Sequence, residues 1–108
     1  MVRISIIIAT YNRGEQLLRT LRSLLSQTLD RDLWEVVVVN NNSTDNTAEG
    51  FERFLAENPD VKNMRMVFES AQGLSHARNK GISESHGEYI AIIDDDEEVN
   101  DRFAEAYL

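Results

Sequence analysis

The stretch "RISIIIAT", residues 3–10, is a dense run of isoleucines near the start of the chain. It is short, β-branched and mostly apolar, which indicates a strand that is covered on both faces. Such strands are typical of parallel sheets, because the crossover connections between parallel strands place helices over the sheet. The run "EVVVV", residues 35–39, has the same character and predicts a second buried strand.

Helical patterns follow each of these strands. Helical spacing of leucines predicts a helix over residues 14–28, with an apolar stripe made of Leu17, Leu18, Leu21, Leu24 and Leu25. After the second strand, Ser43 or Thr44 is expected to cap a helix. The inner face of that helix would carry Ala48, Phe51, Phe54 and Leu55.

The second half of the chain repeats this alternation. A strand is predicted over residues 64–68 and another over 89–93. Between them a helix is predicted over residues 74–85, with Leu74, Ala77 and Ile82 facing inward, and a last short helix is expected near Asn100 and Asp101. The order of elements predicts an α/β fold, with residues 1–108 as one domain built on a Rossmann-like, mostly parallel four-stranded sheet flanked by helices.

Composition narrows the possible partners. The chain has 108 residues and a net charge of −8, which argues against binding to nucleic acid or to an anionic membrane surface. It has no cysteine, so disulfides and thiolate zinc sites are excluded. No apolar run approaches the roughly 18 residues of a membrane span, and no signal peptide is recognisable. We therefore expect a cytoplasmic protein.

Polar side chains follow all four predicted strands. The carboxyl ends of parallel strands meet at one edge of the sheet, and ligands bind there in open α/β folds. The residues that follow the strands are Thr10, Tyr11, Asn12 and Arg13, then Asn40, Asn41 and Asn42, then Glu69, Ser70, Gln72 and Gly73, and finally residues 94–98. The sequence therefore predicts a ligand-binding edge.

The acidic run "IIDDDEEV", residues 92–99, is the most distinctive part of that edge. Residues 88–101 contain seven acids and no base, so the segment has no counter-charge of its own. In extended backbone Asp94 and Asp96 would point to one side and Asp95 to the other. Two carboxylates on one side could hold Mg²⁺ or Mn²⁺ and leave sites for water and phosphate. The alternative is an acidic loop that only faces water or a helix N-terminus.

The first strand-to-helix turn, "ATYNRGE", lacks the glycine patterns of dinucleotide and P-loop sites. A phosphorylated ligand would therefore need another counter-charge, which a carboxylate-bound metal could supply. Asn40 and Asn41 have amides suited to a nucleobase edge, although capping and turn formation explain the residues after them. Arg78 is expected to face partly inward, toward a phosphate or the acids.

Four motifs in order, "SIIIATYNR", "VVVVNNNSTDNTAE", "GLSHARNKGI" and "YIAIIDDDEEV", resemble the nucleotide-binding half of family 2 glycosyltransferases. These are inverting enzymes of GT-A fold that use nucleotide-activated sugars. The resemblance implies a divalent metal, Mn²⁺ or Mg²⁺, and a nucleotide-diphosphate sugar, with a UDP-sugar as the first candidate.

The resemblance also implies a role for each site residue. Thr10 and Asn12 would lie beside the nucleoside, and Tyr11 near the base. Asn40 or Asn41 would replace the carboxylate that contacts the base, and Arg78 would lie near the base and the diphosphate. Asp94 would approach the ribose and the metal, and Asp96 would be the principal metal ligand. Asp95, between them, belongs to the same nucleotide-sugar-binding segment.

Two departures from the family pattern qualify these expectations. The "DDGS"-like segment is "NNNS" here, without its two leading carboxylates. The family's acceptor site and catalytic base lie beyond the D-x-D, so we expect a donor half that is inactive alone, and no catalytic base is assigned. The alternative function is a non-catalytic module that self-associates through a surface left open by truncation. A phosphorylated receiver domain is disfavoured, because receivers have acids directly after the first strand and residues 11–13 include none.

Overall fold

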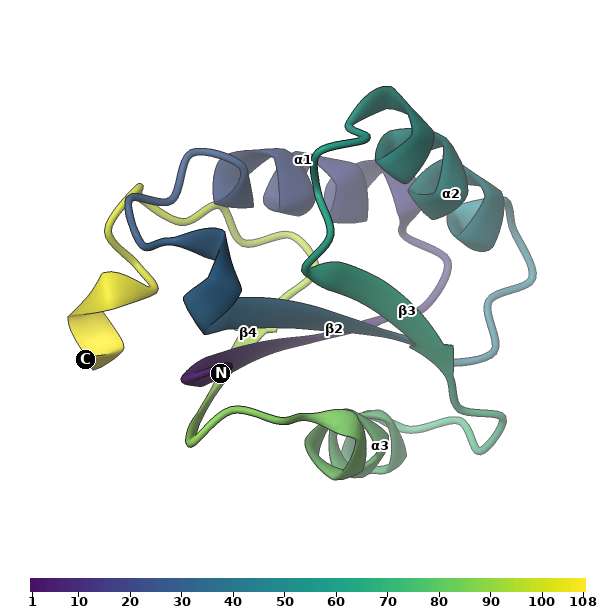
Figure 1. Ribbon diagram of the computed structural model, residues 1–108. Coiled ribbons are helices and arrows are strands. Elements are labelled where there is room, and N and C mark those ends of the chain that lie inside the picture. Colours follow the sequence, from purple (N-terminus) through teal and green to yellow (C-terminus); the bar gives the residue numbers. More distant parts are fainter.

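A computed structural model describes all residues, 1–108, and shows a four-stranded sheet in the order β3-β2-β1-β4 (Figure 1). Every neighbouring pair of strands is parallel, so the predicted parallel sheet is confirmed. The strands are β1 (Ile4–Thr10), β2 (Trp34–Asn40), β3 (Met64–Phe68) and β4 (Tyr89–Asp94). The helices are α1 (Gly14–Leu24), α2 (Thr47–Glu57) and α3 (Leu74–Glu84), with the short 3-10 helices η1 (Arg31–Leu33) and η2 (Glu105–Tyr107).

Helices cover the two faces of the sheet unequally. Helices α1 and α2 lie over one face and α3 over the other (Figure 1). The larger core cluster contains 16 buried residues from all four strands, from α1 and α2, and from the connecting segments at Val61 and Ala104. The smaller cluster lies under α3 and consists of Ile7, Val37, Val39 and Ala77. Alternate residues of β1 and β2 therefore enter different layers, which explains why both strands are apolar without interruption.

Two predicted helices differ in their details. The helix expected over residues 14–28 ends at Leu24. Helix α2 begins only at Thr47, so neither Ser43 nor Thr44 caps it; the N-cap residue is Asn46, whose side chain makes no capping bond. The Thr47 backbone N–H donates to Asp45 Oδ1 at 3.0 Å. The last helix is a single 3-10 turn that starts at Glu105 rather than near residue 100.

The inward face of α3 was predicted wrongly at two of three positions. Leu74 is 54% exposed and Ile82 43% exposed, whereas Ala77 is fully buried. The buried face of α3 consists of Ala77 and Gly81, because these small residues let the helix pack closely on β1 and β2. An added Cβ at Gly81 would clash with Ile7 Cγ2 and lie 3.2 Å from Val39 Cγ2.

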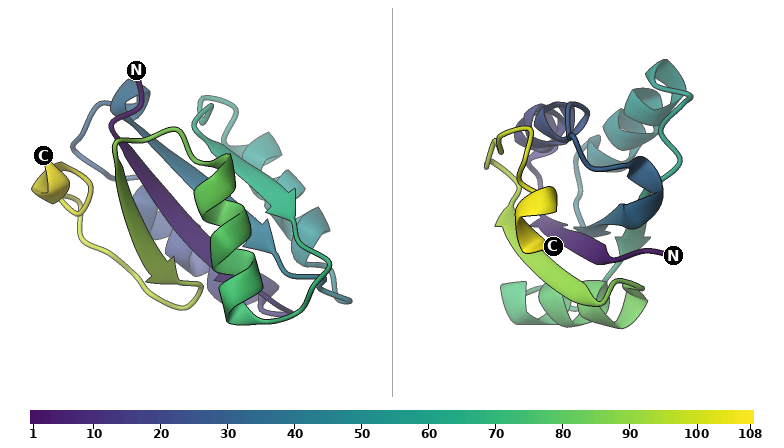
Figure 2. Two further views of the ribbon diagram at one scale, coloured as in Figure 1. Left: turned by 90° about the horizontal axis from the view of Figure 1, so that it is seen from below. Right: turned by 60° about the vertical axis from the view of Figure 1, so that its left-hand side comes forward.

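Strand β4 forms one edge of the sheet and leaves apolar side chains exposed. Ala91 and Ile93 are buried, whereas Tyr89, Ile90 and Ile92 are 46%, 39% and 43% exposed. Helix α3 packs on β1 and β2, and Figure 2 shows β4 beside it rather than beneath it. No helix combines the length and the apolar character needed to cross a membrane.

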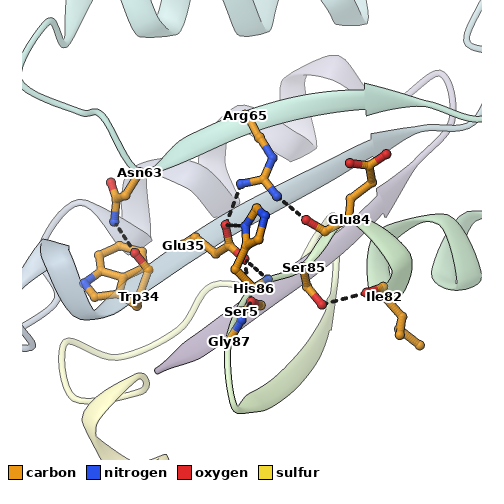
Figure 3. A network of polar contacts seen from close by, with 10 residues as sticks. All are labelled: Ser5, Trp34, Glu35, Asn63, Arg65, Ile82, Glu84, Ser85, His86 and Gly87. Carbon is orange, nitrogen blue, oxygen red and sulfur yellow. Dashed lines mark hydrogen bonds and ion pairs between the residues drawn. The ribbon is translucent and has the colours of Figure 1, made fainter. Parts of the chain in front are cut away.

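A buried carboxylate joins four segments at the amino-terminal end of the sheet (Figure 3). Glu35 of β2 accepts hydrogen bonds from Ser5 Oγ at 2.6 Å, from the His86 backbone N–H at 2.7 Å, and from Arg65 of β3. Burial alone would raise the pKa of Glu35, but the hydrogen bonds from Ser5, Arg65 and His86 outweigh it and lower the pKa from 4.5 to about 2. The network also anchors the α3–β4 connection, because the Gly87 N–H donates to Ser5 Oγ at 2.8 Å.

Candidate functional site

Two adjoining pockets lie at the carboxyl ends of the strands. One, of about 450 Å³, is lined by Ala9, Tyr11, Arg13, Leu74, Asp94, Asp95 and Asp96. The other, of about 270 Å³, is lined by Ala9, Thr10, Tyr11, Asn41, Gln72, Gly73 and Leu74. Ala9, Tyr11 and Leu74 line both pockets. The sheet register explains the arrangement, because Ala9 of β1 is level with Asp94 of β4 and Thr10 is level with Asn40 of β2.

The three adjacent aspartates occupy different environments. Strand β4 ends at Asp94, and a turn follows in which the Glu97 N–H donates to the Asp94 carbonyl at 3.2 Å. Asp94 and Asp96 are exposed, whereas Asp95 is only 7% exposed. The alternation expected from extended backbone is thus present, although residues 95–96 lie in a turn. Glu97 closes this turn, since its Oε1 accepts from the Asp94 N–H at 3.2 Å.

Asp95 connects the acidic turn to β1 and α1. Its Oδ2 accepts a hydrogen bond from Thr10 Oγ1 at 3.0 Å, and its carbonyl accepts one from Thr20 Oγ1 at 2.9 Å. Burial raises the pKa of Asp95, and the charge of Asp96 adds to this, while Thr10 and Arg13 act in the opposite direction. The side chains of Thr10 and Asp95 therefore face each other inside the protein and hold the turn in place.

Arg13 supplies the counter-charge that the acidic segment lacks. Its Nη1 lies 3.6 Å from Asp95 Oδ1 and 3.5 Å from Asp96 Oδ2. Sequence reasoning placed Arg13 at this edge but assigned it no role, because the pairing joins residues more than 80 positions apart. The available signal was a base after the first strand and unpaired acids after the fourth, at one edge of a parallel sheet.

Asn12 holds two loops together. Its backbone has a φ of 52°, in the left-handed region that asparagine tolerates better than most residues. Its Oδ1 accepts from the Thr44 N–H at 2.8 Å and from the Asp45 N–H at 3.2 Å, while its own N–H donates to Ser43 Oγ at 3.0 Å. These contacts fix the loop after β1 against the loop after β2.

The amides of Asn40 and Asn41 are also used within the protein. Asn41 Nδ2 donates to the carbonyls of Glu69 and Ala71 at 3.1 and 2.9 Å, and its Oδ1 accepts from the Gly73 N–H at 3.0 Å. Asn40 Oδ1 accepts from the Ser43 N–H at 2.9 Å. Both asparagines are buried. The Asn41 amide shapes the loop that lines the smaller pocket at Gln72 and Gly73, whereas the Asn40 amide holds the loop after β2.

Arg78 lies apart from the other predicted site residues. It is half-buried on α3 and lines neither pocket. Its Nε is buried and has no hydrogen-bond partner within the protein. The remaining predicted residues, Thr10, Tyr11, Asn41 and Asp94–Asp96, line the two pockets, and Asn12 and Asn40 support the loops around them.

A cavity of about 350 Å³ at the opposite, amino-terminal edge has a different character. Its charged side chains pair with one another, as in the 2.9 Å contact of Arg31 with Asp60 and the contact of Arg65 with Glu35. Asn63 Oδ1 in its lining is buried without a hydrogen-bond partner. Two exposed carboxylates, in contrast, line the larger pocket at the carboxyl edge.

The chemistry of those carboxylates fits a hard divalent cation. Nowhere do three or more histidine, cysteine, aspartate or glutamate side chains form a cluster that could bind a metal. A cation at this edge would therefore have only one or two carboxylate ligands and would take the others from water and phosphate oxygens. Mg²⁺ usually binds nucleotides in proteins with such a ligand set.

Comparison with known proteins agrees with this fold. A mannosyltransferase from Pyrobaculum calidifontis, solved in complex with GDP-Man and Mn²⁺, is 34% identical with a TM-score of 0.81, and the match covers 87% of this chain and 27% of that chain. TarS of S. aureus, solved with UDP-GlcNAc, is 25% identical with a TM-score of 0.83, covering 98% of this chain and 30% of that chain. The fold is that of the GT-A glycosyltransferases.

The sequence comparisons define the family. The model of glycosyl transferase family 2 matches residues 5–108, and the chain belongs to this family. An uncharacterized glycosyltransferase of Escherichia coli K12, YibD, is 36% identical over 100 residues, which are 90% of this chain and 27% of YibD. The chain thus spans about a quarter to a third of the length of such relatives.

Proposed function

We propose that this chain binds the nucleotide-sugar donor, together with a divalent metal, as part of an inverting glycosyltransferase. The observation that carries the proposal is the pair of adjoining pockets, which share Tyr11 as a wall. One pocket has the acids that could hold a metal and a diphosphate. The other is a recess of about 270 Å³ whose size suits a nucleoside. Family membership over residues 5–108 supports the same activity.

Each pocket has its own residues in this proposal. Asp96 and Asp94 hold the metal, which when bound stabilises the negative charge of the departing nucleoside diphosphate. Tyr11 lies against the base, while Thr10 and Asp95 brace the turn between the pockets. Asn41 positions the loop at residues 71–73 rather than reading the base through its amide, since its amide is already hydrogen-bonded. Asn12 and Asn40 act through the loops they hold.

The donor and the product are proposed from the relatives. TarS has been solved with UDP and with UDP-GlcNAc, and the Pyrobaculum enzyme with GDP-Man. A UDP-sugar remains the first candidate. Poly-beta-1,6-N-acetyl-D-glucosamine synthase of Staphylococcus epidermidis, 36% identical over 98 residues, favours a place in polysaccharide synthesis. Inversion needs a general base for the acceptor hydroxyl, and we assign this role to no residue of the chain.

The test compares two adjacent, chemically identical residues. With Mn²⁺ present, UDP at ten times its Kd is expected to raise the Tm of the chain by about 5–10 °C, and only weakly when EDTA is added. Asp96→Asn should abolish the metal-dependent part of this shift. Asp95→Asn should keep most of it, because an asparagine oxygen can still accept the hydrogen bond from Thr10. Thermal unfolding with and without Mn²⁺ measures the effect, and equal losses in both variants would contradict the assignment.

Self-association without turnover is the second candidate function. The exposed Tyr89, Ile90 and Ile92 on the edge strand β4 favour it, because apolar edge strands tend to pair with another chain. In that case the sedimentation coefficient of the wild type should rise with concentration. Ile92→Lys, which places a charge on the exposed face, should remain monomeric. A wild type that is monomeric at every concentration would exclude this function.

A further inference from the structure

Arg13 alone among the basic residues forms ion pairs with residues 94–98. Its two distances, 3.6 Å to Asp95 and 3.5 Å to Asp96, are longer than the roughly 2.8 Å of a well-formed charge-assisted hydrogen bond. The Arg13 side chain is 52% exposed and the Asp96 side chain is 55% exposed. The guanidinium is therefore held loosely, because solvent weakens the attraction between exposed charges.

The backbone of Arg13, in contrast, is fixed. Asn12 is bound to the loop after β2 through its side chain and its N–H. The Arg13 carbonyl accepts a hydrogen bond from the Leu17 N–H at 2.9 Å as α1 begins. A fixed backbone with a loosely held side chain lets the guanidinium exchange partners without moving away from the pocket that it lines with Asp94 and Asp96.

We propose that Arg13 is a ligand-binding residue that couples metal binding to diphosphate binding. This inference rests on the proposed function of the same pocket. In the free protein the guanidinium neutralises part of the charge of Asp95 and Asp96, so it opposes a bare divalent cation at those carboxylates. When a nucleoside diphosphate enters with the cation, its anionic oxygens offer the guanidinium two parallel hydrogen bonds, which arginine forms readily with phosphate.

Arg13 should thus have opposite effects on the two ligands. It weakens the binding of the cation alone, because two positive charges compete for one set of carboxylates. It strengthens the binding of a nucleoside diphosphate in the presence of the cation, because it supplies a further positive charge to the phosphates. A residue with a merely structural role would not change the two affinities in opposite directions, so the pair of measurements is diagnostic.

The experiment uses Arg13→Gln in the full chain, with Mn²⁺ and UDP as the probes. The concentration of free Mn²⁺ is measured by electron paramagnetic resonance. The affinity of the variant for Mn²⁺ alone is expected to rise about fivefold. UDP binding at saturating Mn²⁺ is measured by calorimetry, and its affinity is expected to fall at least about tenfold. Arg19→Gln is the matched control, since it makes the same charge change at an exposed position of α1 that forms no ion pair.

The possible results separate the two proposals. If wild type binds UDP with Mn²⁺ but Arg13→Gln leaves the Mn²⁺ affinity unchanged or lowers it, the coupling role of Arg13 is overturned and the proposed function stands. Equal changes in Arg19→Gln would also overturn it, because they would reflect net charge alone. If wild type binds no UDP even with Mn²⁺, the proposed function is overturned, and the role of Arg13 with it.

Discussion

Gly81→Ala is expected to lower the free energy of unfolding by about 3 kcal/mol, although it adds a single methyl group to a helix. The new Cβ would collide with Ile7 Cγ2 and lie 3.2 Å from Val39 Cγ2. Both neighbours are fully buried, so neither can move into solvent. Helix α3 must then lift from β1 and β2, which would break the packing around Ala77. Urea unfolding followed by circular dichroism measures the loss.

Gly50→Ala is the matched control for this prediction. Gly50 lies in α2, and the nearest atom to an added Cβ is Leu18 Cδ1 at 3.8 Å, an ordinary contact. Without a clash, alanine should stabilise the helix by about 0.5–1 kcal/mol. The same substitution is therefore expected to act in opposite directions in two helices of one protein. Destabilisation of equal size at both positions would show that the close approach of α3 is not the cause.

The close approach of α3 also shows where sequence patterns stop being informative. The isoleucine and valine runs of β1 and β2 predict buried strands because an apolar run with helices on both sides has few alternatives. In α3 the apolar residues Leu74 and Ile82 suggested the wrong face, since the distance between helix and sheet selects small residues there. That distance depends on the sheet and cannot be read from the helix alone.

In the candidate site, too, some features can be predicted from the sequence and others cannot. Its position follows from topology, because the ends of parallel strands must gather at one edge, and the structure brings Tyr11, Asn41 and Asp94 there as expected. The partners within the site depend on loop conformations. The sequence shows that an asparagine can bind a base, but not that the Asn41 amide is already bonded to the loop at residues 69–73.

The sequence itself indicates that Glu35 needs a partner. A single acid at the start of a buried valine run requires a partner, because an unpaired charge in such a place is very costly. The sequence does not say which partners satisfy it, since Ser5, Arg65 and His86 lie 30, 30 and 51 positions away. The register of β1, β2 and β3, together with the α3–β4 connection that carries His86, brings them to one point (Figure 3).

Glu35→Gln should lower the free energy of unfolding at pH 7 by about 3 kcal/mol, because it leaves Arg65 without its buried counter-charge. The pKa of Glu35 is lowered to about 2 in the folded protein, so its carboxylate stabilises the fold fully above pH 4.5. That stabilisation is lost as pH falls from about 4.5 toward 2. The difference between wild type and Glu35→Gln should therefore shrink over this range in urea unfolding. Glu57→Gln, at an exposed position of α2, is the control and should change the free energy of unfolding little at any pH. If the loss of stability in Glu35→Gln were the same at every pH, the charged network would not be its cause.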